Sequence, residues 1–161
     1  MTTTATATTA TTARDAAVEH FAAKLRYETD PSDVAAAQTA GDRFVLVDTR
    51  GHVAWQQGRA AGAIHLPTGE ISARAASEIP LDAPVVVYCW GPGCNGSTKA
   101  ALHFSRLGYE VRELIGGFEY WAREGLPVVD DAGPVLRPVD ELTGPRVSSS
   151  TSSDGVIGCD C

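Results

Sequence analysis

The fold is decided by the stretch from Val85 to Lys99, which reads VVVYCWGPGCNGSTK. Residues 85–88 form a short apolar run of mostly β-branched side chains preceded by Pro84, which predicts a central strand. Residues 97–107 are rich in helix formers and stop at Gly108, which predicts a helix. A tight glycine-rich loop is therefore expected between them, with Cys89 at the point where the strand ends.

Cys89 is the candidate reactive residue of this loop. Glycines let backbone amides converge on one point, and the N-terminus of the following helix adds partial positive charge. We expect a cradle for an anion beside Cys89, built from Trp90, Gly91, Gly93, Cys94, Asn95, Gly96 and Ser97. In such surroundings the pKa of a thiol falls below its usual value of about 8.5, so a thiolate is expected at neutral pH. The alternative is a buried and inert cysteine, because free cysteine packs like a small hydrophobic residue, but the glycine-rich surroundings argue against it.

The rest of the chain alternates helical and strand patterns. Helices are predicted over residues 14–28, 30–40 and 118–124, the second with a start signal at Asp30-Pro31 and an end at Gly41. Strands are predicted over residues 44–48, 61–66 and 110–114. This alternation predicts an α/β fold with a central parallel sheet and helices on both faces, and ligands gather at the carboxyl ends of such strands.

Length and composition set the broad class. A chain of 161 residues, 43% hydrophobic and 20% charged, predicts one folded domain over residues 14–130. The Thr/Ala-rich residues 1–13 predict a disordered tail, and residues 131–161 predict an extended or disordered tail that ends in Cys-Asp-Cys. The net charge of -7 argues against a nucleic-acid surface. With no expected membrane span or secretion signal, we expect a cytoplasmic protein with reduced thiols.

Four segments in the same order resemble the rhodanese-like family. They are Leu46-Val47-Asp48-Thr49-Arg50, residues 58–67 (GRAAGAIHLP), Tyr88-Cys89 with its loop, and residues 116–127 (GGFEYWAREGLP). The resemblance covers roughly residues 31–129. It implies an α/β domain with a parallel sheet, and a cysteine that accepts a sulfur atom and passes it on as a persulfide. By position that cysteine is Cys89.

The resemblance implies a two-step sulfurtransferase without cofactor or metal. A thiolate takes sulfur from a small donor such as thiosulfate, and cyanide, a small thiol or a protein thiol then removes it. The loop departs from the family pattern because it is about two residues longer and lacks the usual arginine, with Lys99 as the nearest cation in sequence. A larger or less charged donor is therefore also a candidate.

Three alternatives stay open. Rhodanese-like domains also serve as binding or regulatory modules without turnover. The longer loop is similar to that of relatives that act on phosphate or arsenate, although those use a Cys-x5-Arg pattern and this chain has Asn95 at the sixth position. A nucleotide-binding loop is disfavoured because the order Gly96-Ser97-Thr98-Lys99 does not match that motif.

Smaller features have both structural and functional interpretations. Cys94 is a candidate partner for a disulfide or polysulfide with Cys89, against simple packing in a tight loop. Trp90 is interpreted as a residue that forms a pocket wall or stacks on a substrate, or as one that covers the core. Structural roles are expected for Asp48, Arg50, His52, His65, His103, Phe118 and Trp121. Cys159 and Cys161 are candidate acceptors of sulfur from Cys89. Their spacing disfavours zinc.

Overall fold

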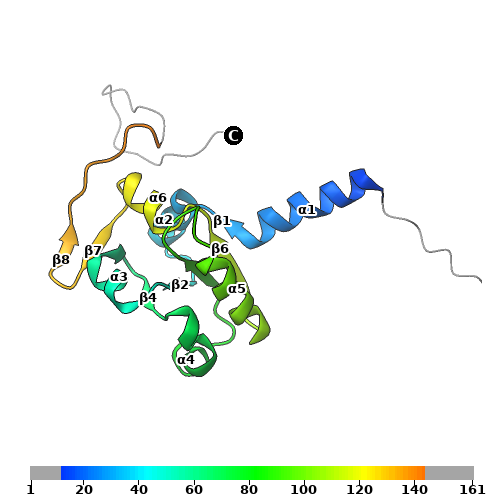
Figure 1. Cartoon of the computed structure of the whole chain (residues 1–161), viewed down its shortest axis with the longest axis horizontal. Helices are drawn as coiled ribbons and strands as arrows, with labels where there is room; N and C mark the ends of the chain where they lie inside the picture. The colour runs from blue at the N-terminus through cyan, green and yellow to red at the C-terminus, as the bar shows by residue number, and fades with distance from the viewer. Residues whose placement is uncertain (1–11, 144–161) are drawn as a thin grey trace, which may run out of the picture.

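The structure, a computed structural model, describes residues 12–143 of the 161 (Figure 1). Residues 1–11 of the predicted N-terminal tail lie outside the described residues, and so do Cys159 and Cys161.

Five parallel strands form the central sheet, in the order β1-β6-β5-β2-β4. Their bounds are β1 Glu28–Thr29, β2 Val45–Asp48, β4 Ile64–His65, β5 Val85–Tyr88 and β6 Val111–Leu114. The strands predicted around residues 44–48, 85–88 and 110–114 are thus confirmed. The strand predicted over residues 61–66 shrinks to β4, because the backbone turns at Gly62 with a positive φ of 81°.

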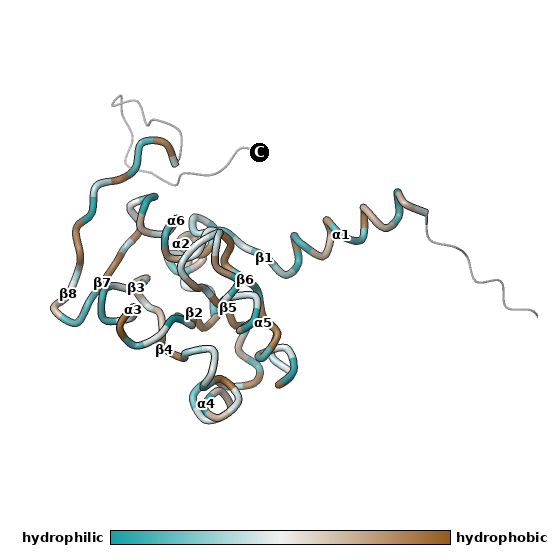
Figure 2. The backbone as a smooth tube through the Cα atoms, viewed as in Figure 1, coloured by the Kyte–Doolittle hydropathy of each residue, from teal (hydrophilic) through white to brown (hydrophobic). Residues whose placement is uncertain are grey.

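Helices cover both faces of this sheet, which confirms the predicted α/β architecture. On one face lie α4 (Ile71–Glu78) and α5 (Gly96–Arg106), and on the other α2 (Pro31–Ala40) and α6 (Gly117–Arg123). Each face of the sheet has its own hydrophobic core, and strand β5 contributes to both. Val85 and Val87 pack in the core beneath α4 and α5, and Val86 and Tyr88 pack in the core beneath α2 and α6. A strand that is buried on both faces has a continuous run of apolar residues, as β5 does. Figure 2 shows apolar residues at the centre of the folded body.

The start and end signals of α2 act as expected. The Asp30 carboxylate accepts the backbone N–H of Asp33 at 2.9 Å, and Pro31 occupies the first turn. Gly41 ends the helix in the left-handed conformation with φ 78°. Each signal satisfies or removes a backbone group that the helix leaves unpaired at its ends.

A second sheet was not predicted from the sequence. Strands β3 (Arg59–Ala60), β7 (Val128–Asp130) and β8 (Gly133–Val135) pair antiparallel in the order β3-β7-β8. The β7–β8 hairpin therefore continues past residue 130, into the segment predicted as a tail. Short helical segments at α3 (His52–Gln57) and η1 (Thr68–Glu70) were also missed, and so was α4. Elements this short lack a clear period in the sequence.

The first helix, α1 (Ala13–Tyr27), forms where it was predicted but projects away from the sheet (Figure 1). Thr12 caps it through a reciprocal pair of hydrogen bonds with Asp15, so helical order begins within the predicted tail. The spacing of Val18, Phe21 and Leu25 places them on one face of this helix, and all three are exposed. Within residues 12–143, no helix combines the length and apolar character that a membrane crossing needs.

Candidate active site

Cys89 follows directly after β5, at the carboxyl edge of the central sheet. Thr49, at the end of β2, donates both its backbone N–H and its hydroxyl to the Tyr88 carbonyl, at 3.0 and 2.7 Å. From the opposite side, the Phe118 N–H of α6 donates to the Cys89 carbonyl at 2.9 Å. The backbone of Cys89 is thus held between β2 and the start of α6.

The close approach of α6 depends on glycine. Gly117 has a positive φ of 58°, and a Cβ built there would lie 2.7 Å from the Cys89 carbonyl oxygen. Its neighbour Gly116 is also left-handed, with φ 78°. Glycine is therefore required where α6 starts, because a side chain at Gly117 would collide with the backbone of the loop that follows β5.

The two cysteines of the loop face each other. The sulfur of Cys89 lies 2.9 Å from the sulfur of Cys94, and both are free thiols. Cys89 is buried, with 7% of its surface exposed, whereas Cys94 is partly exposed. Gly96 makes room for the pair, since a Cβ there would lie 2.5 Å from the Cys89 sulfur and 3.3 Å from the Cys94 sulfur.

The titration of this pair corrects the expected thiolate at Cys89. Burial, followed by the hydrogen bond with Cys94, raises the pKa of Cys89 to about 11, which outweighs the opposite effects of the Trp90 amide and Arg50. The hydrogen bond from Cys89 lowers the pKa of Cys94, with help from the amides of Gly96 and Trp90. The expectation is wrong because burial disfavours the Cys89 thiolate more strongly than the Trp90 amide and Arg50 favour it. Of the two thiols, Cys94 is therefore the one whose ionised form the contact favours.

Cysteine alkylation should follow this order. At neutral pH we expect a small alkylating reagent to modify Cys94 first in the wild-type protein, and modification of Cys89 to rise as pH approaches about 11. In Cys94→Ser, the two contributions of Cys94 that raise the pKa of Cys89 disappear. Alkylation of Cys89 should then begin at a lower pH. Peptide mass spectrometry across a pH series measures this, and an unchanged or higher midpoint would contradict the assignment.

The predicted amide cradle is present only in part. The Trp90 amide interacts with both sulfurs and the Gly96 amide with that of Cys94. The Cys94 amide instead closes a turn by donating to the Gly91 carbonyl at 3.0 Å. Asn95 lies at the start of α5, where its side chain makes no capping hydrogen bond. The buried Ser97 hydroxyl donates to Glu113 at 2.8 Å, so it anchors the loop to β6.

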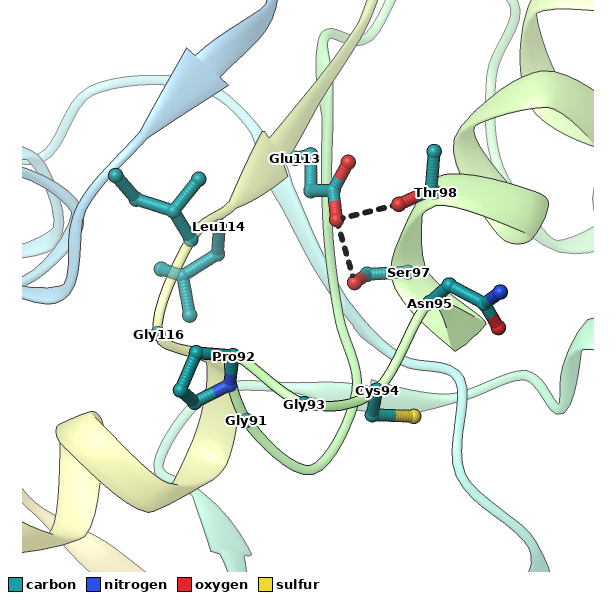
Figure 3. Close-up of a pocket in the computed structure, with 11 residues that line it drawn as sticks. Gly91, Pro92, Gly93, Cys94, Asn95, Ser97, Thr98, Glu113, Leu114 and Gly116 are labelled. Atoms are coloured by element: carbon teal, nitrogen blue, oxygen red, sulfur yellow. Dashed lines mark hydrogen bonds between the residues drawn. The ribbon is translucent and has the colours of Figure 1, made fainter.

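A hollow of about 510 Å³ adjoins the loop (Figure 3). Of the predicted site residues, five line it: Gly91, Gly93, Cys94, Asn95 and Ser97. The remaining three, Cys89, Trp90 and Gly96, do not. Across the hollow stands Glu113, whose carboxylate also accepts the Thr98 hydroxyl at 2.9 Å. Figure 3 shows the Cys94 sulfur directed away from Glu113, although Cys94 lines the hollow.

Arg50 supplies a cation that the loop itself lacks. The predicted structural role is confirmed, since its guanidinium pairs with the fully buried Asp48 at 2.6 Å and donates to the Gly58 carbonyl at 2.7 Å. The guanidinium also lies 4.5 Å from the ring of Trp90 and 4.1 Å from that of Phe118. Within residues 12–143, Nη1 of Arg50 is the buried side-chain nitrogen or oxygen without a hydrogen-bond partner.

Sequence reasoning missed this second role of Arg50, because the approach of Trp90 depends on the loop conformation. Trp90 is 45% exposed and covers the guanidinium, so it is neither a wall of the hollow nor a core residue. The positive charge of Arg50 favours the ionised form of Cys89. The site thus combines a thiol pair, two amides and a covered cation.

Phe118, Trp121 and His65 have structural roles here. Phe118 and Trp121 are buried, which confirms their predicted place in the core. His65 contacts the Arg50 carbonyl through Nε2 at 2.9 Å and stacks on Trp55 at 4.8 Å between ring centroids. These contacts confirm the structural interpretation of His65.

Comparisons with known proteins agree with this architecture. The sequence pattern described as the rhodanese-like domain matches residues 30–124. A protein of Allochromatium vinosum named sulfurtransferase is 41% identical over 90 residues, which cover 55% of this chain and 81% of that protein. The HTH-type transcriptional regulator Rv0324 of Mycobacterium tuberculosis is 39% identical over 90 residues, but this match covers 56% of the chain and only 39% of the regulator.

A solved structure with a similar fold supports the same family assignment. The crystal structure of the BH2092 protein from Bacillus halodurans superposes with a TM-score of 0.69 and 37% sequence identity. The match covers 74% of this chain and 88% of that one. The likeness therefore extends over most of the described residues.

Proposed function

Because the chain belongs to the rhodanese-like domain family, we propose that it transfers sulfane sulfur through a persulfide on Cys89. The observation that carries the proposal is the position of the Cys89 sulfur, 2.9 Å from a second thiol and facing the Trp90 amide at the carboxyl edge of the sheet. A similar protein that the chain covers over most of its length is named a sulfurtransferase. The cytoplasm remains the expected location.

The raised pKa of Cys89 requires a base for the first step. Cys94 is suited to it, since its sulfur lies 2.9 Å from that of Cys89 and the contact with Cys89 lowers the pKa of Cys94. As the proton moves to Cys94, the Cys89 sulfur attacks the outer sulfur of thiosulfate. The new S–S bond forms while the S–S bond of thiosulfate breaks, and sulfite leaves with its electron pair. The product is a Cys89 persulfide anion beside a neutral Cys94.

The donor is a small molecule and the acceptor is cyanide or a thiol, including a protein thiol. The loop from Cys89 to Thr98 carries no basic side chain, so a donor anion depends on the amides and on Arg50. Burial of Cys89 favours donors with a slim, exposed terminal sulfur. Thiosulfate and mercaptopyruvate both meet this condition.

Sulfite release tests the proposal directly. Under anaerobic single-turnover conditions, we expect thiosulfate to yield one sulfite per protein chain, and excess cyanide present from the start to intercept the persulfide as thiocyanate. Mercaptopyruvate should yield pyruvate by the same attack on its sulfur. Colorimetric assays of the three products suffice, with heat-unfolded protein as the control. Absence of all three products with both donors would refute the proposed activity.

A regulatory module is the second candidate function. It is favoured by the match to part of the Rv0324 regulator, whose remaining length this match does not cover. Such a module would take up sulfur or an oxidant without turning over. Retention of a single equivalent of sulfur on the protein, with no thiocyanate and no hydrosulfide formed in excess cyanide, would support this candidate.

A further inference from the structure

The thiol pair is built into the loop rather than produced by chance proximity. Cys89 ends a strand, and the turn closed by the Cys94 amide and the Gly91 carbonyl brings Cys94 back over it. Only the missing side chain of Gly96 leaves space for both sulfurs, as the distances of 2.5 and 3.3 Å to a built Cβ indicate. The result is a sulfur–sulfur distance of 2.9 Å, slightly closer than the roughly 3–3.5 Å at which reacting atoms are held for attack.

The two thiols differ in access. Cys89 is buried, with 7% of its surface exposed, whereas Cys94 is partly exposed. A persulfide on Cys89 would place its inner sulfur where the Cys89 sulfur now lies, next to Cys94. The nucleophile nearest to that inner sulfur is therefore part of the chain itself.

From this geometry we propose that Cys94 discharges the Cys89 persulfide, forming a Cys89–Cys94 disulfide and releasing hydrosulfide. The inference rests on the proposed function, because it needs the persulfide as its starting point. It adds a second activity to the same loop, the reduction of sulfane sulfur to hydrosulfide. Cys94 acts here as a catalytic residue, since it bonds to a reacting atom.

The step balances in atoms and electrons. The proton that Cys94 received during loading returns to the outer sulfur of the persulfide. The Cys94 thiolate then attacks the inner sulfur, so that a Cys89–Cys94 bond forms and the bond to the outer sulfur breaks. Hydrosulfide leaves with the electron pair. The two cysteine sulfurs are oxidised to a disulfide as the outer sulfur is reduced.

An external dithiol must restore the reduced pair. Its first thiolate attacks the exposed Cys94 sulfur, which releases Cys89, and its second thiol resolves the mixed disulfide. The dithiol becomes oxidised and both cysteines are free again. A full cycle therefore converts thiosulfate and a dithiol into sulfite, hydrosulfide and a cyclic disulfide.

A single-turnover experiment without reductant tests the proposal. The full-length, fully reduced protein is mixed anaerobically with thiosulfate, and sulfite, hydrosulfide and protein mass are measured in parallel. Cys89 and Cys94 lie between Arg74 and Lys99 on one tryptic peptide, separate from Cys159 and Cys161. We expect one hydrosulfide for each sulfite, and this peptide should lack two hydrogen atoms.

Cys94→Ser is the matched variant. Serine keeps the size of the side chain but cannot displace hydrosulfide, so sulfur should remain on Cys89 as an added sulfur mass. Because Cys94 is also the base for loading, this variant should load more slowly, so hydrosulfide is compared per sulfite released. Without reductant, this ratio should fall about ten-fold or more. A second variant, Cys159→Ser with Cys161→Ser, should behave as the wild type. A protein mixed without thiosulfate should stay reduced, which controls for oxidation by air.

The outcomes separate the two proposals. Sulfite release with the added sulfur retained on wild-type Cys89 would overturn the discharge step and leave the sulfurtransferase intact. Fragment ions that place the added sulfur on Cys94 would also overturn it, because Cys94 would then have attacked the outer sulfur. No sulfite from either protein would overturn the proposed function, and the discharge step with it.

Discussion

Replacing Cys89 with serine is expected to reduce sulfur transfer to background, a loss of roughly a thousand-fold or more. A serine hydroxyl is a far weaker nucleophile towards sulfur than a thiolate, and it cannot hold sulfur as a persulfide. Both the sulfite burst and steady thiocyanate formation should disappear. The side chain is close in size and sits beside the Trp90 amide and Arg50, so the fold should persist.

Unfolding measurements complete this test. The thermal midpoint of Cys89→Ser should stay close to that of the wild type, since a single buried sulfur is exchanged for oxygen with a hydrogen-bonding neighbour at Trp90. Residual activity that vanishes only when Cys94 is also replaced would contradict the assignment. It would move the persulfide to Cys94, the thiol with the lowered pKa.

Gly117→Ala is expected to damage stability and activity together. The position has φ 58°, where a side chain costs about 1–2 kcal/mol in backbone strain. The new Cβ would also meet the Cys89 carbonyl oxygen at 2.7 Å and the Gly91 nitrogen at 3.0 Å. Relief of this overlap must move α6 or the loop. We expect a total loss of about 2–4 kcal/mol in the free energy of unfolding.

Gly41→Ala provides the matched control. Gly41 has a positive φ of 78°, but a Cβ there meets nothing within 4 Å. It should therefore lose about 1 kcal/mol through backbone strain and keep its sulfite burst. Urea unfolding and the single-turnover assay compare the two variants. Equal activities in Gly117→Ala and Gly41→Ala would show that the approach of α6 to Cys89 has no functional role.

The predictions of secondary structure were confirmed where the sequence carried a clear local signal. β5 and α2 carried clear signals, a four-residue apolar run in one case and capping residues in the other. The β3-β7-β8 sheet failed because strands of two or three residues leave no period to detect. The apolar face of α1 shows a different limit, since the spacing was helical but did not reveal whether anything covers that face.

For the site, the sequence indicated which loop to examine and which thiol ends the strand. It did not indicate the order in which the two thiols titrate. That order depends on burial of Cys89 and on the 2.9 Å contact with Cys94, which are properties of the folded loop. The sequence also predicted a structural role for Arg50 without indicating that its guanidinium lies 4.5 Å from the ring of Trp90.

The sequence by itself determined the α/β class, the rhodanese-like family and the position of Cys89 at a strand end, because these follow from local spacing and from motifs in a fixed order. Tertiary structure alone decided that Cys89 is buried against Cys94, that Arg50 supplies the nearby positive charge, and that Gly117 admits α6. The physical reason is that desolvation and electrostatic fields depend on distances between segments, which residue order along the chain does not specify.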